Sequence, residues 1–539
     1  MPVFFKIKII PLILLLSLFF AVILNYPLLQ HLHSILTTLE HVQIGFVISI
    51  PFVLIAALNF LFTIFSFRFI LKIFFSLLLL SGSVVSYSAL KYKVIFDQVM
   101  IQNILETNQQ EASSYINSSI ILWFLFTGFL PTLFLLFAKV EYPSKWYKGV
   151  LYRFISMSAS LFVLAGISAI YYKDYASVGR NNPTLNKEII PANYVYSGLR
   201  YIQSTYFTNV KPFKILGEDA IRKTRGKKPV LMFLVVGETA RSQNFSVNGY
   251  KRNTNIFTDK QGGIVSFKNF YSCGTATAVS VPCMFSNLER ANFNKKEAAN
   301  RENVLDIIQK TGISVLWLEN DGGCKGVCKR IPTIEIKPSD DHKLCNDKTC
   351  YDEVMLKYID KNITENHGDK LIAFHMTGSH GPTYYQRYPV EHRYFQPDCR
   401  RSDIENCTKE QLINTYDNTI RYTDYVLSKL IEKLKNYSDK YDPVLIYISD
   451  HGESLGENGL YLHGTPYKFA PEEQTRVPFL IWMSSGFISE KEIDMNCLIK
   501  KAKNNSYSHD NLFSSLLGLW DIKTNIYNSE NDIFYSCRN

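Results

Sequence analysis

The sequence predicts a bundle of five membrane helices followed by an α/β domain. Five long apolar runs lie before about residue 173, and beyond it short apolar runs alternate with helix-length polar stretches. A chain of 539 residues is also too long for one ordinary hydrophobic core. We therefore divide it into a transmembrane domain (1–172), an interfacial connector (173–228) and an outer domain (229–539).

Each of the five long runs can cross a membrane. A span needs roughly 17–25 apolar residues, and no charged residue stands in the middle of these runs. Lys6 and Lys8 before the first run would also suit a signal peptide, but the residues around Pro27 offer no small-residue cleavage site, so we expect the run to be retained. The runs are 9–28, 44–67, 73–90, 116–138 and 154–171.

The distribution of Lys and Arg predicts the orientation of these spans, because positive residues resist translocation. The first loop, 25–43, has neither residue, and the third has only Lys91 and Lys93. The N-terminus and the second and fourth connections should therefore face the cytoplasm, which places everything after residue 173 outside. The basic residues of the cytoplasmic side are Lys6, Lys8, Arg68, Lys72, Lys139, Lys145, Lys148 and Arg153.

Cysteine usage agrees with that topology, since all ten cysteines lie in the outer domain and disulfides form in oxidising compartments. Zinc binding by the close pairs is the alternative, but a second Cys-x-x-Cys pair, usual for such sites, is absent. Sequence neighbours suggest the pairs Cys273–Cys283, Cys324–Cys328, Cys345–Cys350 and Cys399–Cys407, leaving Cys497 with Cys537.

The formal charge of +10 suits an anionic lipid surface better than nucleic acid, for which no motif is present. An ordinary solvated surface explains the charge equally well.

Short apolar runs in the outer domain predict strands buried on both faces, hence a parallel sheet covered by helices. Ligands of such sheets collect at the carboxyl ends of the strands. Glu238 follows the first run, and Asp450 and His451 follow the fourth; carboxylate and imidazole there are suitable zinc ligands. The runs are 230–236, 313–318, 371–375, 444–448 and 479–483.

Three further histidines, His375, His380 and His463, stand in polar, glycine-containing contexts. A small, hydroxyl-rich segment, 272–283, contains Thr277 and is bounded by two cysteines whose bridge would hold a helix start rigidly. Zinc coordination can turn a threonine hydroxyl into a nucleophile, and a helix N-terminus favours an incoming phosphate. A turn rich in hydroxyl residues is the alternative reading of this segment.

Four motifs in one order closely resemble the bacterial phosphoethanolamine transferases that act on lipid A, including the mobile colistin resistance enzymes. They are G-E-T-A-R-S, N-G-Y, S-C-G-T-A-T-A-V-S-V-P-C-M-F-S and S-D-H-G-E-S-L-G-E-N-G. The resemblance covers nearly the whole chain. It implies an alkaline-phosphatase/sulfatase-like domain in the periplasm, anchored in the bacterial inner membrane. It also implies one tightly bound Zn²⁺ with a possible second, a phosphatidylethanolamine donor, a lipid A acceptor and polymyxin resistance. We expect a monomer.

The resemblance also implies residue roles. Thr277 matches the zinc-bound nucleophile, and Glu238, Asp450 and His451 match the other ligands. The remaining matches are His380 and His463 with phosphate or a second zinc, Lys325 with the donor phosphate, and Asn103, Thr107 and Glu111 with the donor headgroup. Those last three repeat every four residues, which predicts one helix face. Asp321 stands where the family often has an amide, so its contact is open.

Three other classes fit less well. A sulfatase makes its nucleophile in a C/S-x-P-x-R motif, but Met284 occupies the arginine position after Ser280-Val281-Pro282-Cys283. A glycerolphosphate transferase typically uses manganese, and the probable disulfides and closer motif match disfavour it. The intact ligand set argues against a non-catalytic lipid-binding protein. A sister transferase acting on a core sugar remains open, because it shares the intermediate.

Overall fold

The structure is a computed structural model whose contacts separate two compact units. The membrane unit comprises residues 1–101 and 116–208, and the outer unit comprises 102–115 and 209–539. This division differs from the one drawn on the sequence, since 173–208 group with the membrane helices and 102–115 with the outer domain. Described are residues 5–39, 42–107, 109–207, 212–223, 226–346, 349–364 and 368–538, without the side chains of Gln110 and Glu111.

In the described residues of the membrane unit, four helices are long and apolar enough to cross a membrane, or five if one bent pair counts as a span. The pair corresponds to the first apolar run, and its halves meet at 55°. The helices are α1 (Ile9–Phe19) and α2 (Tyr26–Leu36), α3 (Ile44–Ile64), α4 (Leu71–Tyr92), α7 (Ser118–Phe124) continuing through a π-helical turn into α8 (Leu130–Phe137), and α9 (Trp146–Asn181), with α10 (Ala192–Tyr206) following.

A buried asparagine explains why the chain after α9 belongs to the membrane unit. Asn25, at the bend between α1 and α2, donates from Nδ2 to the Ile190 carbonyl at 2.7 Å and accepts from the Ile190 amide at 2.8 Å. Tyr194 in α10 also receives a hydrogen bond from Ser81. These contacts fold the expected connector back onto the helices.

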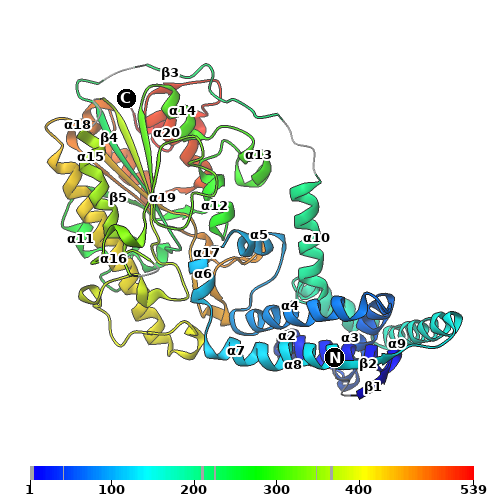
Figure 1. Ribbon diagram of the computed structural model, residues 1–539. Coiled ribbons are helices and arrows are strands. Elements are labelled where there is room, and N and C mark those ends of the chain that lie inside the picture. Colours follow the sequence, from blue (N-terminus) through cyan, green and yellow to red (C-terminus); the bar gives the residue numbers. More distant parts are fainter. Residues whose placement is uncertain are drawn as a thin grey trace. The chain divides into compact units, whose positions relative to one another are not determined.

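A second asparagine joins α3 to α9 (Figure 1). Asn59 Nδ2 donates to Ser156 Oγ at 3.0 Å and to Ser160 Oγ at 2.9 Å. Ser49 of α3 and Tyr175 of α9 form a further hydrogen bond at 2.8 Å. Hydrocarbon does not drive apolar helices together, so these polar contacts help to fix how the two helices meet.

The central sheet of the outer unit has the strand order β5-β13-β10-β4-β9-β7-β8. All five short apolar runs form strands of this sheet, as predicted. The bounds are β4 (Val230–Gly237), β5 (Ile264–Phe267), β7 (Ser314–Glu319), β8 (Thr333–Glu335), β9 (Lys370–His375), β10 (Asp442–Ser449) and β13 (Phe479–Met483).

The prediction of a parallel sheet is correct for β10, β4, β9, β7 and β8 and wrong for β13. β13 runs antiparallel to β10, and β5 runs antiparallel to β13. A strand that is buried on both faces has the same apolar pattern in either direction, so the sequence could not predict that β13 is antiparallel. The carboxyl end of β13 consequently lies at the opposite edge from those of β4 and β10.

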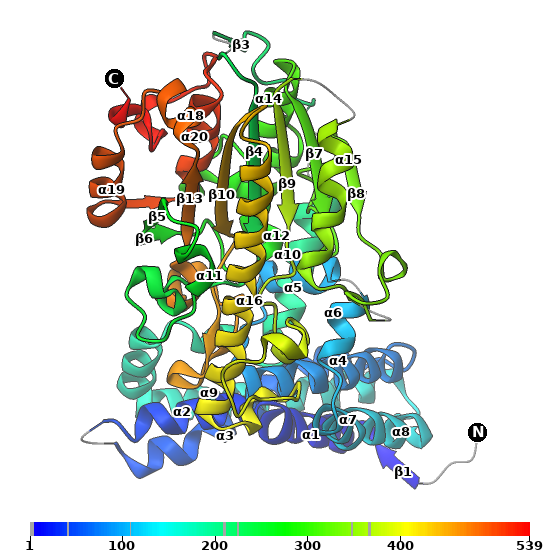
Figure 2. The same ribbon diagram turned by 90° about the vertical axis from the view of Figure 1, so that its left-hand side faces the viewer.

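Helices cover both faces of this sheet, as the two ribbon views agree (Figures 1 and 2): α15 and α16 lie on one face, and α12, α14 and α20 on the other. α16 begins with a capping box in which Thr408 and Gln411 satisfy each other's backbone amides. The helices are α6 (Gln109–Ser114), α11 (Ile256–Asp259), α12 (Thr277–Met284), α13 (Lys295–Ala299), α14 (Val304–Lys310), α15 (Ile359–Thr364), α16 (Lys409–Asn436), α17 (Glu472–Thr475), α18 (Ser485–Glu490), α19 (Met495–Asn504) and α20 (Leu512–Leu519).

Small two-stranded sheets complete the fold: β1 (Phe5–Lys8) with β2 (Ala138–Glu141), β3 (Ile221–Arg222) with β15 (Ile522–Lys523), β6 (Asn269–Tyr271) with β14 (Ser506–Ser508), and β11 (Ser454–Leu455) with β12 (Tyr461–Leu462).

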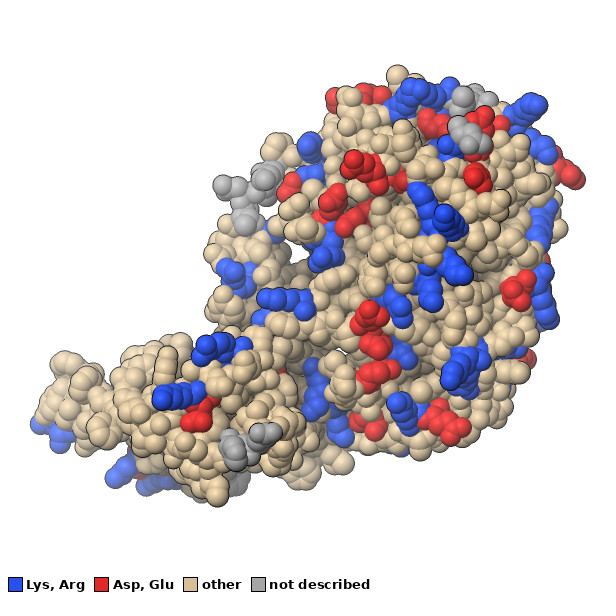
Figure 3. Space-filling model, turned by 180° about the vertical axis from the view of Figure 1, so that it is seen from behind, with Lys and Arg blue, Asp and Glu red and all other residues tan. Residues whose placement is uncertain are grey.

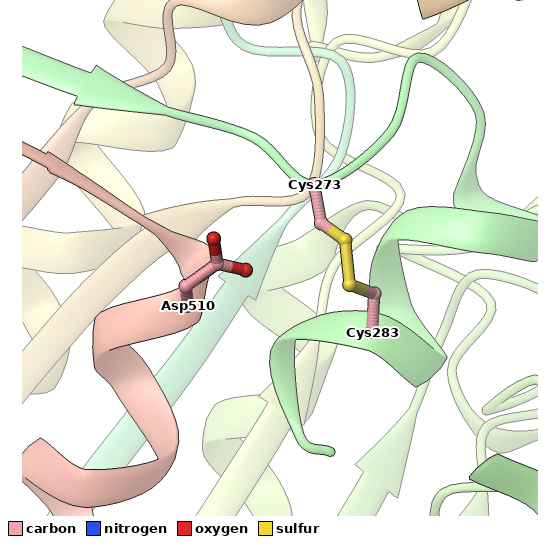
Figure 4. A group of neighbouring side chains, drawn as sticks. All are labelled: Cys273, Cys283 and Asp510. Carbon is pink, nitrogen blue, oxygen red and sulfur yellow. A yellow bond between two sulfur atoms is a disulfide. The ribbon is translucent and has the colours of Figure 1, made fainter. Parts of the chain in front are cut away.

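The ten cysteines form the five disulfides that sequence neighbours suggested. The bridge Cys273–Cys283 ties the loop before α12 to the helix itself, with Asp510 nearby (Figure 4). Because both sulfurs are bonded to each other, this cluster offers no thiolate to a metal. On the face shown in Figure 3, basic and acidic side chains are interspersed over the outer unit, so the net charge marks no single binding surface there.

We expect Asn59→Ala to weaken the packing of α9 on α3. Losing hydrogen bonds between membrane helices should reduce the free energy of unfolding by roughly 1 kcal/mol. Denaturant titration of the full chain in mixed micelles measures this loss. Ser158→Ala is the matched control, because Ser158 lies exposed on α9 between the two serines that bind Asn59. Equal stability of the two variants would contradict the assignment.

Candidate active site

The parallel register brings four strand ends together at one edge of the sheet. Gly237 of β4 pairs with Ser449 of β10, so Glu238 and Asp450, the next residues, are neighbours. His375 ends β9 beside Val236 and opposite Glu319 of β7. The acids and histidines that the sequence scatters over more than 200 positions thus meet at one place.

Glu238, Asp450 and His451 form a compact group of candidate metal ligands. One ligand atom from each lies within 4.8 Å of the others, and all three side chains are fully buried. His451 donates from Nδ1 to the Gly452 carbonyl at 2.9 Å, which leaves Nε2 facing Glu238 Oε1 at 3.4 Å and Asp450 Oδ2 at 3.3 Å. Burial lowers the pKa of His451 to about 4, so the imidazole is neutral and able to donate a lone pair.

Thr277 is the first residue of α12, where the sequence predicted a helix start. Its hydroxyl donates to Glu238 Oε2 at 3.1 Å and lies 3.3 Å from His451 Nε2. The following turn is fixed as well, because Ser280 Oγ donates to the Asp450 carbonyl. The structure therefore brings all four residues predicted to bind the metal into one group.

A glycine makes this packing possible. Gly378 follows β9 with a positive φ of 52°, a conformation that favours glycine. A Cβ at this position would stand 2.7 Å from the Glu238 carbonyl oxygen and 2.9 Å from its amide nitrogen. The loop can pass Glu238 only because Gly378 has no side chain.

His380 and His463 lie beside that group. Their ring centroids are 5.5 Å apart, and His463 is 4.5 Å from the ring of His451. Glu453 Oε2 accepts a hydrogen bond from His463 Nδ1 at 2.8 Å, while its Oε1 accepts from the Tyr384 hydroxyl. Glu453 and Tyr384 were missed as site residues, although Glu453 stands within the S-D-H-G-E-S motif.

Glu319 is another functional residue that sequence reasoning missed. It accepts hydrogen bonds from His375 Nδ1 at 2.9 Å and from Trp317 Nε1 at 2.9 Å. Burial alone would lower the pKa of His375, but Glu319, Asp321 and Asp450 raise it to about 9. Only its place at the end of a buried run, like that of His375, could have indicated this acid.

Lys325 lies in the loop closed by Cys324–Cys328 and has a φ of 49°. Burial raises the pKa of Asp321 to about 6, while the positive charges of His375, His380 and Lys325 oppose that shift. Lys325 therefore lies within electrostatic reach of Asp321.

The predicted single helix face of Asn103, Thr107 and Glu111 is not found. α5 (Gln98–Glu106) contains Asn103 and ends before Thr107, whose hydroxyl donates back to the Asn103 carbonyl at 2.7 Å. A new helix, α6, then begins at Gln109. The break separates Glu111 from the other two; its side chain lies outside the described residues.

Segment 102–115 belongs to the outer unit through contacts at both of its ends. Glu106 accepts from Lys295 Nζ at 2.6 and 2.7 Å. Burial, together with the nearby charge of Lys325, lowers the pKa of Lys295. Burial and Glu453 raise the pKa of Tyr384, with a contribution from Tyr115. The segment therefore binds Lys295 through Glu106 and lies within electrostatic reach of Tyr384 through Tyr115.

The chain thus combines candidate membrane helices with a buried carboxylate–imidazole group that faces a hydroxyl at a helix start. Family models match the chain in two parts: "Sulfatase" over residues 231–522 and "Phosphoethanolamine transferase EptA/EptB" over residues 54–206.

Individual proteins support the same assignment. Phosphoethanolamine transferase EptA of Escherichia coli K12 is 40% identical over 96% of this chain and 94% of its own length. Phosphatidylethanolamine transferase Mcr-1 of E. coli is 36% identical over 89% of each chain. The structure of the integral membrane lipooligosaccharide phosphoethanolamine transferase A of Neisseria meningitidis aligns with a TM-score of 0.95 and 38% identity, covering 98% of this chain and 99% of that one. The chain belongs to the phosphoethanolamine transferase family and is a multi-pass membrane protein.

We expect Glu106→Gln to loosen segment 102–115. The variant keeps the shape of the side chain but removes a partly buried charge pair worth about 1 kcal/mol, which corresponds to a roughly fivefold increase in the undocked population. Hydrogen exchange of the backbone amides of 102–115 in the full chain measures this population. The exchanged pair Glu106→Lys with Lys295→Glu should restore protection; unchanged exchange in Glu106→Gln would contradict the contact's role.

Proposed function

We propose that this chain transfers phosphoethanolamine from phosphatidylethanolamine to a phosphate of lipid A through a phosphoethanolamine-threonine intermediate on Thr277. One observation carries the proposal: the Thr277 hydroxyl lies at the N-terminus of α12, within 3.1 Å of Glu238 and 3.3 Å of His451. Helix N-termini favour anions, so an incoming phosphodiester would meet the nucleophile there.

The residues around Thr277 fit a divalent cation. Two fully buried carboxylates, Glu238 and Asp450, face each other across a neutral imidazole, and Asp450 Oδ2 has no hydrogen-bond partner among the described residues. Burying such charges without compensation costs several kcal/mol per ion. Oxygen and nitrogen donors of this kind suit Zn²⁺, with Glu238, Asp450, His451 and Thr277 holding it. When bound, the ion would supply a lowered hydroxyl pKa and neutralise developing negative charge.

The transfer takes two displacements. The Thr277 oxygen forms a bond to the donor phosphorus while the phosphorus–oxygen bond to diacylglycerol breaks, and the leaving oxygen takes a proton. A phosphate oxygen of lipid A then attacks the same phosphorus, and the bond to Thr277 breaks. His380, His463 and Lys325 would hold the non-bridging oxygens, since phosphoryl transfer depends on positioning and charge stabilisation. Glu453 orients His463 for that task.

The donor's ammonium would meet segment 102–115. Asn103, Thr107 and Glu111 are the proposed headgroup contacts; Asn103 would act from α5, Glu111 from α6, and Thr107 from the residues between them. We further propose that the bent pair α1–α2 counts as one of five spans, that the chain resides in the inner membrane with the outer unit in the periplasm, and that it works as a monomer. Disulfides and loop charges support this orientation.

A core-sugar acceptor is the alternative. One relative, the Kdo(2)-lipid A phosphoethanolamine 7''-transferase of Salmonella typhimurium, is 32% identical over 48% of this chain. The match to EptA is longer and closer than the match to this relative. Transfer to either acceptor would pass through the same phosphoethanolamine-threonine intermediate, so the metal site alone does not distinguish the two.

Expression of this chain in a susceptible Gram-negative host should add phosphoethanolamine to lipid A, and Thr277→Ala should abolish the adduct, because no other hydroxyl replaces the nucleophile. Mass spectrometry of extracted lipid A measures both. Thr275→Ala is the matched control, since Thr275 Oγ1 donates to the Thr465 carbonyl instead and should leave the adduct in place. An adduct on the core sugar instead of lipid A would move the assignment to the alternative acceptor.

The same strain should become less susceptible to polymyxin. An added ammonium reduces the negative charge that attracts cationic peptides to the outer surface. The minimal inhibitory concentration of polymyxin should rise in cells that express the unmodified chain and not in cells that express Thr277→Ala. Unchanged susceptibility in cells whose lipid A carries the adduct would contradict the charge argument while leaving the transfer intact.

A further inference from the structure

A second group of candidate ligands shares Glu238 with the group around Thr277. Glu238, Asp321 and His375 each offer one ligand atom, and these atoms lie within 4.8 Å of one another. The side chain of His375 is fully buried and that of Asp321 is 8% exposed. None of the roles inferred from the sequence uses this combination.

The orientation of His375 points to a ligand. Its Nδ1 lies 2.9 and 3.1 Å from the two oxygens of Glu319, which also accepts from Trp317 Nε1 and from the Asp321 amide at 2.7 Å. Metal-binding histidines typically have one ring nitrogen fixed by a carboxylate in this way, so that the other can coordinate.

The other nitrogen faces the group. His375 Nε2 has no hydrogen-bond partner in the described part of the chain and lies 3.8 Å from Asp321 Oδ2, beyond hydrogen-bond distance. Two ligands of one tetrahedral zinc lie about 3.4 Å apart, given bonds of ~2.0–2.2 Å. His375 Nε2 and Asp321 Oδ2 would therefore have to move only slightly closer together to bind the same ion.

We propose that Glu238, Asp321 and His375 bind a second divalent cation, with Glu319 as the residue that positions His375. Two carboxylates and one imidazole suit Zn²⁺. Glu238 would then belong to both groups of ligands. The proposed ligand set shares no residue with His380 and His463, and it rests on the proposed function only through Glu238.

The competing arrangement is an ion pair in which a charged His375 lies between Glu319 and Asp321 without any metal. The two arrangements respond differently to Asp321→Asn. The amide keeps the size of the side chain but removes the anionic ligand, so it lowers metal content only if a metal is bound there.

Zinc content of the full chain separates these cases. The purified chain in detergent is stripped with a chelator, titrated with Zn²⁺, desalted and measured by elemental mass spectrometry. We expect two equivalents in the parent and one in both Asp321→Asn and His375→Gln. Glu319→Gln should weaken the second site by roughly 10–100-fold. His463→Gln should keep two equivalents.

One equivalent of zinc in the parent, or two equivalents in Asp321→Asn, would overturn the proposal. Loss of the second equivalent in His463→Gln also overturns it, because the ion would then lie at the other histidines. Thermal unfolding of the stripped variants shows whether they are folded. Anomalous diffraction from zinc-loaded crystals gives an independent readout, with a peak expected between Asp321 and His375.

Failure of this inference is distinguishable from failure of the proposed function. A lipid A adduct from a chain with one zinc would leave the transfer in place and remove the second site. A folded chain that binds two zinc ions but forms no adduct would support the second metal site and contradict the proposed transfer.

Discussion

The arrangement of the outer unit depends on two carboxylates that the parallel pairing of β4 and β10 forces together. Because Gly237 and Ser449 are in register, Glu238 and Asp450 leave adjacent strands at the same level and are both fully buried. Like charges in such a place repel each other and lose their hydration, so the fold tolerates them only with compensating positive charge. The neutral His451 does not provide that charge, and the positive charge of His375 is shared among Glu319, Asp321 and Asp450. A divalent cation would add the compensation that remains.

The surrounding contacts keep Thr277 within reach of those carboxylates. The disulfide Cys273–Cys283 closes the turn, and Ser280 binds the carbonyl of Asp450. His509 bridges the same region, with Nε2 donating to the Ser449 carbonyl and Nδ1 accepting from the Cys273 amide. The proposed role of Thr277 as a nucleophile would require its position to be held to within a fraction of an ångström, and these three contacts would supply that support.

Most strands of the central sheet and several candidate site residues could be predicted from the sequence, because the patterns that indicate them lie within short segments. A buried strand is a continuous apolar run, so all five runs were found, together with Glu238, Asp450 and His451, which follow two of them. The direction of β13 was not predicted, because the apolar pattern of a strand buried on both faces is the same in either direction. The end of α5 at Glu106 was not predicted either, because a spacing of four residues does not reveal the contacts that end a helix. Glu319 was missed for a related reason: its partners, His375 and Trp317, reveal its role only once β7 and β9 pair.

The membrane region contributes more than an anchor, since segment 102–115 groups with the outer unit although the chain on both sides of it belongs to the membrane unit. Its two ends bracket the site: Glu106 binds Lys295 beside Lys325, and Tyr115 lies within electrostatic reach of Tyr384, which binds Glu453. Asn103, Thr107 and Glu111, which we propose as headgroup contacts, belong to this segment, whereas the acids and histidines that we propose to act on phosphorus follow the strands of the central sheet. In the proposed mechanism, donor recognition and phosphoryl chemistry would therefore come from different parts of the chain.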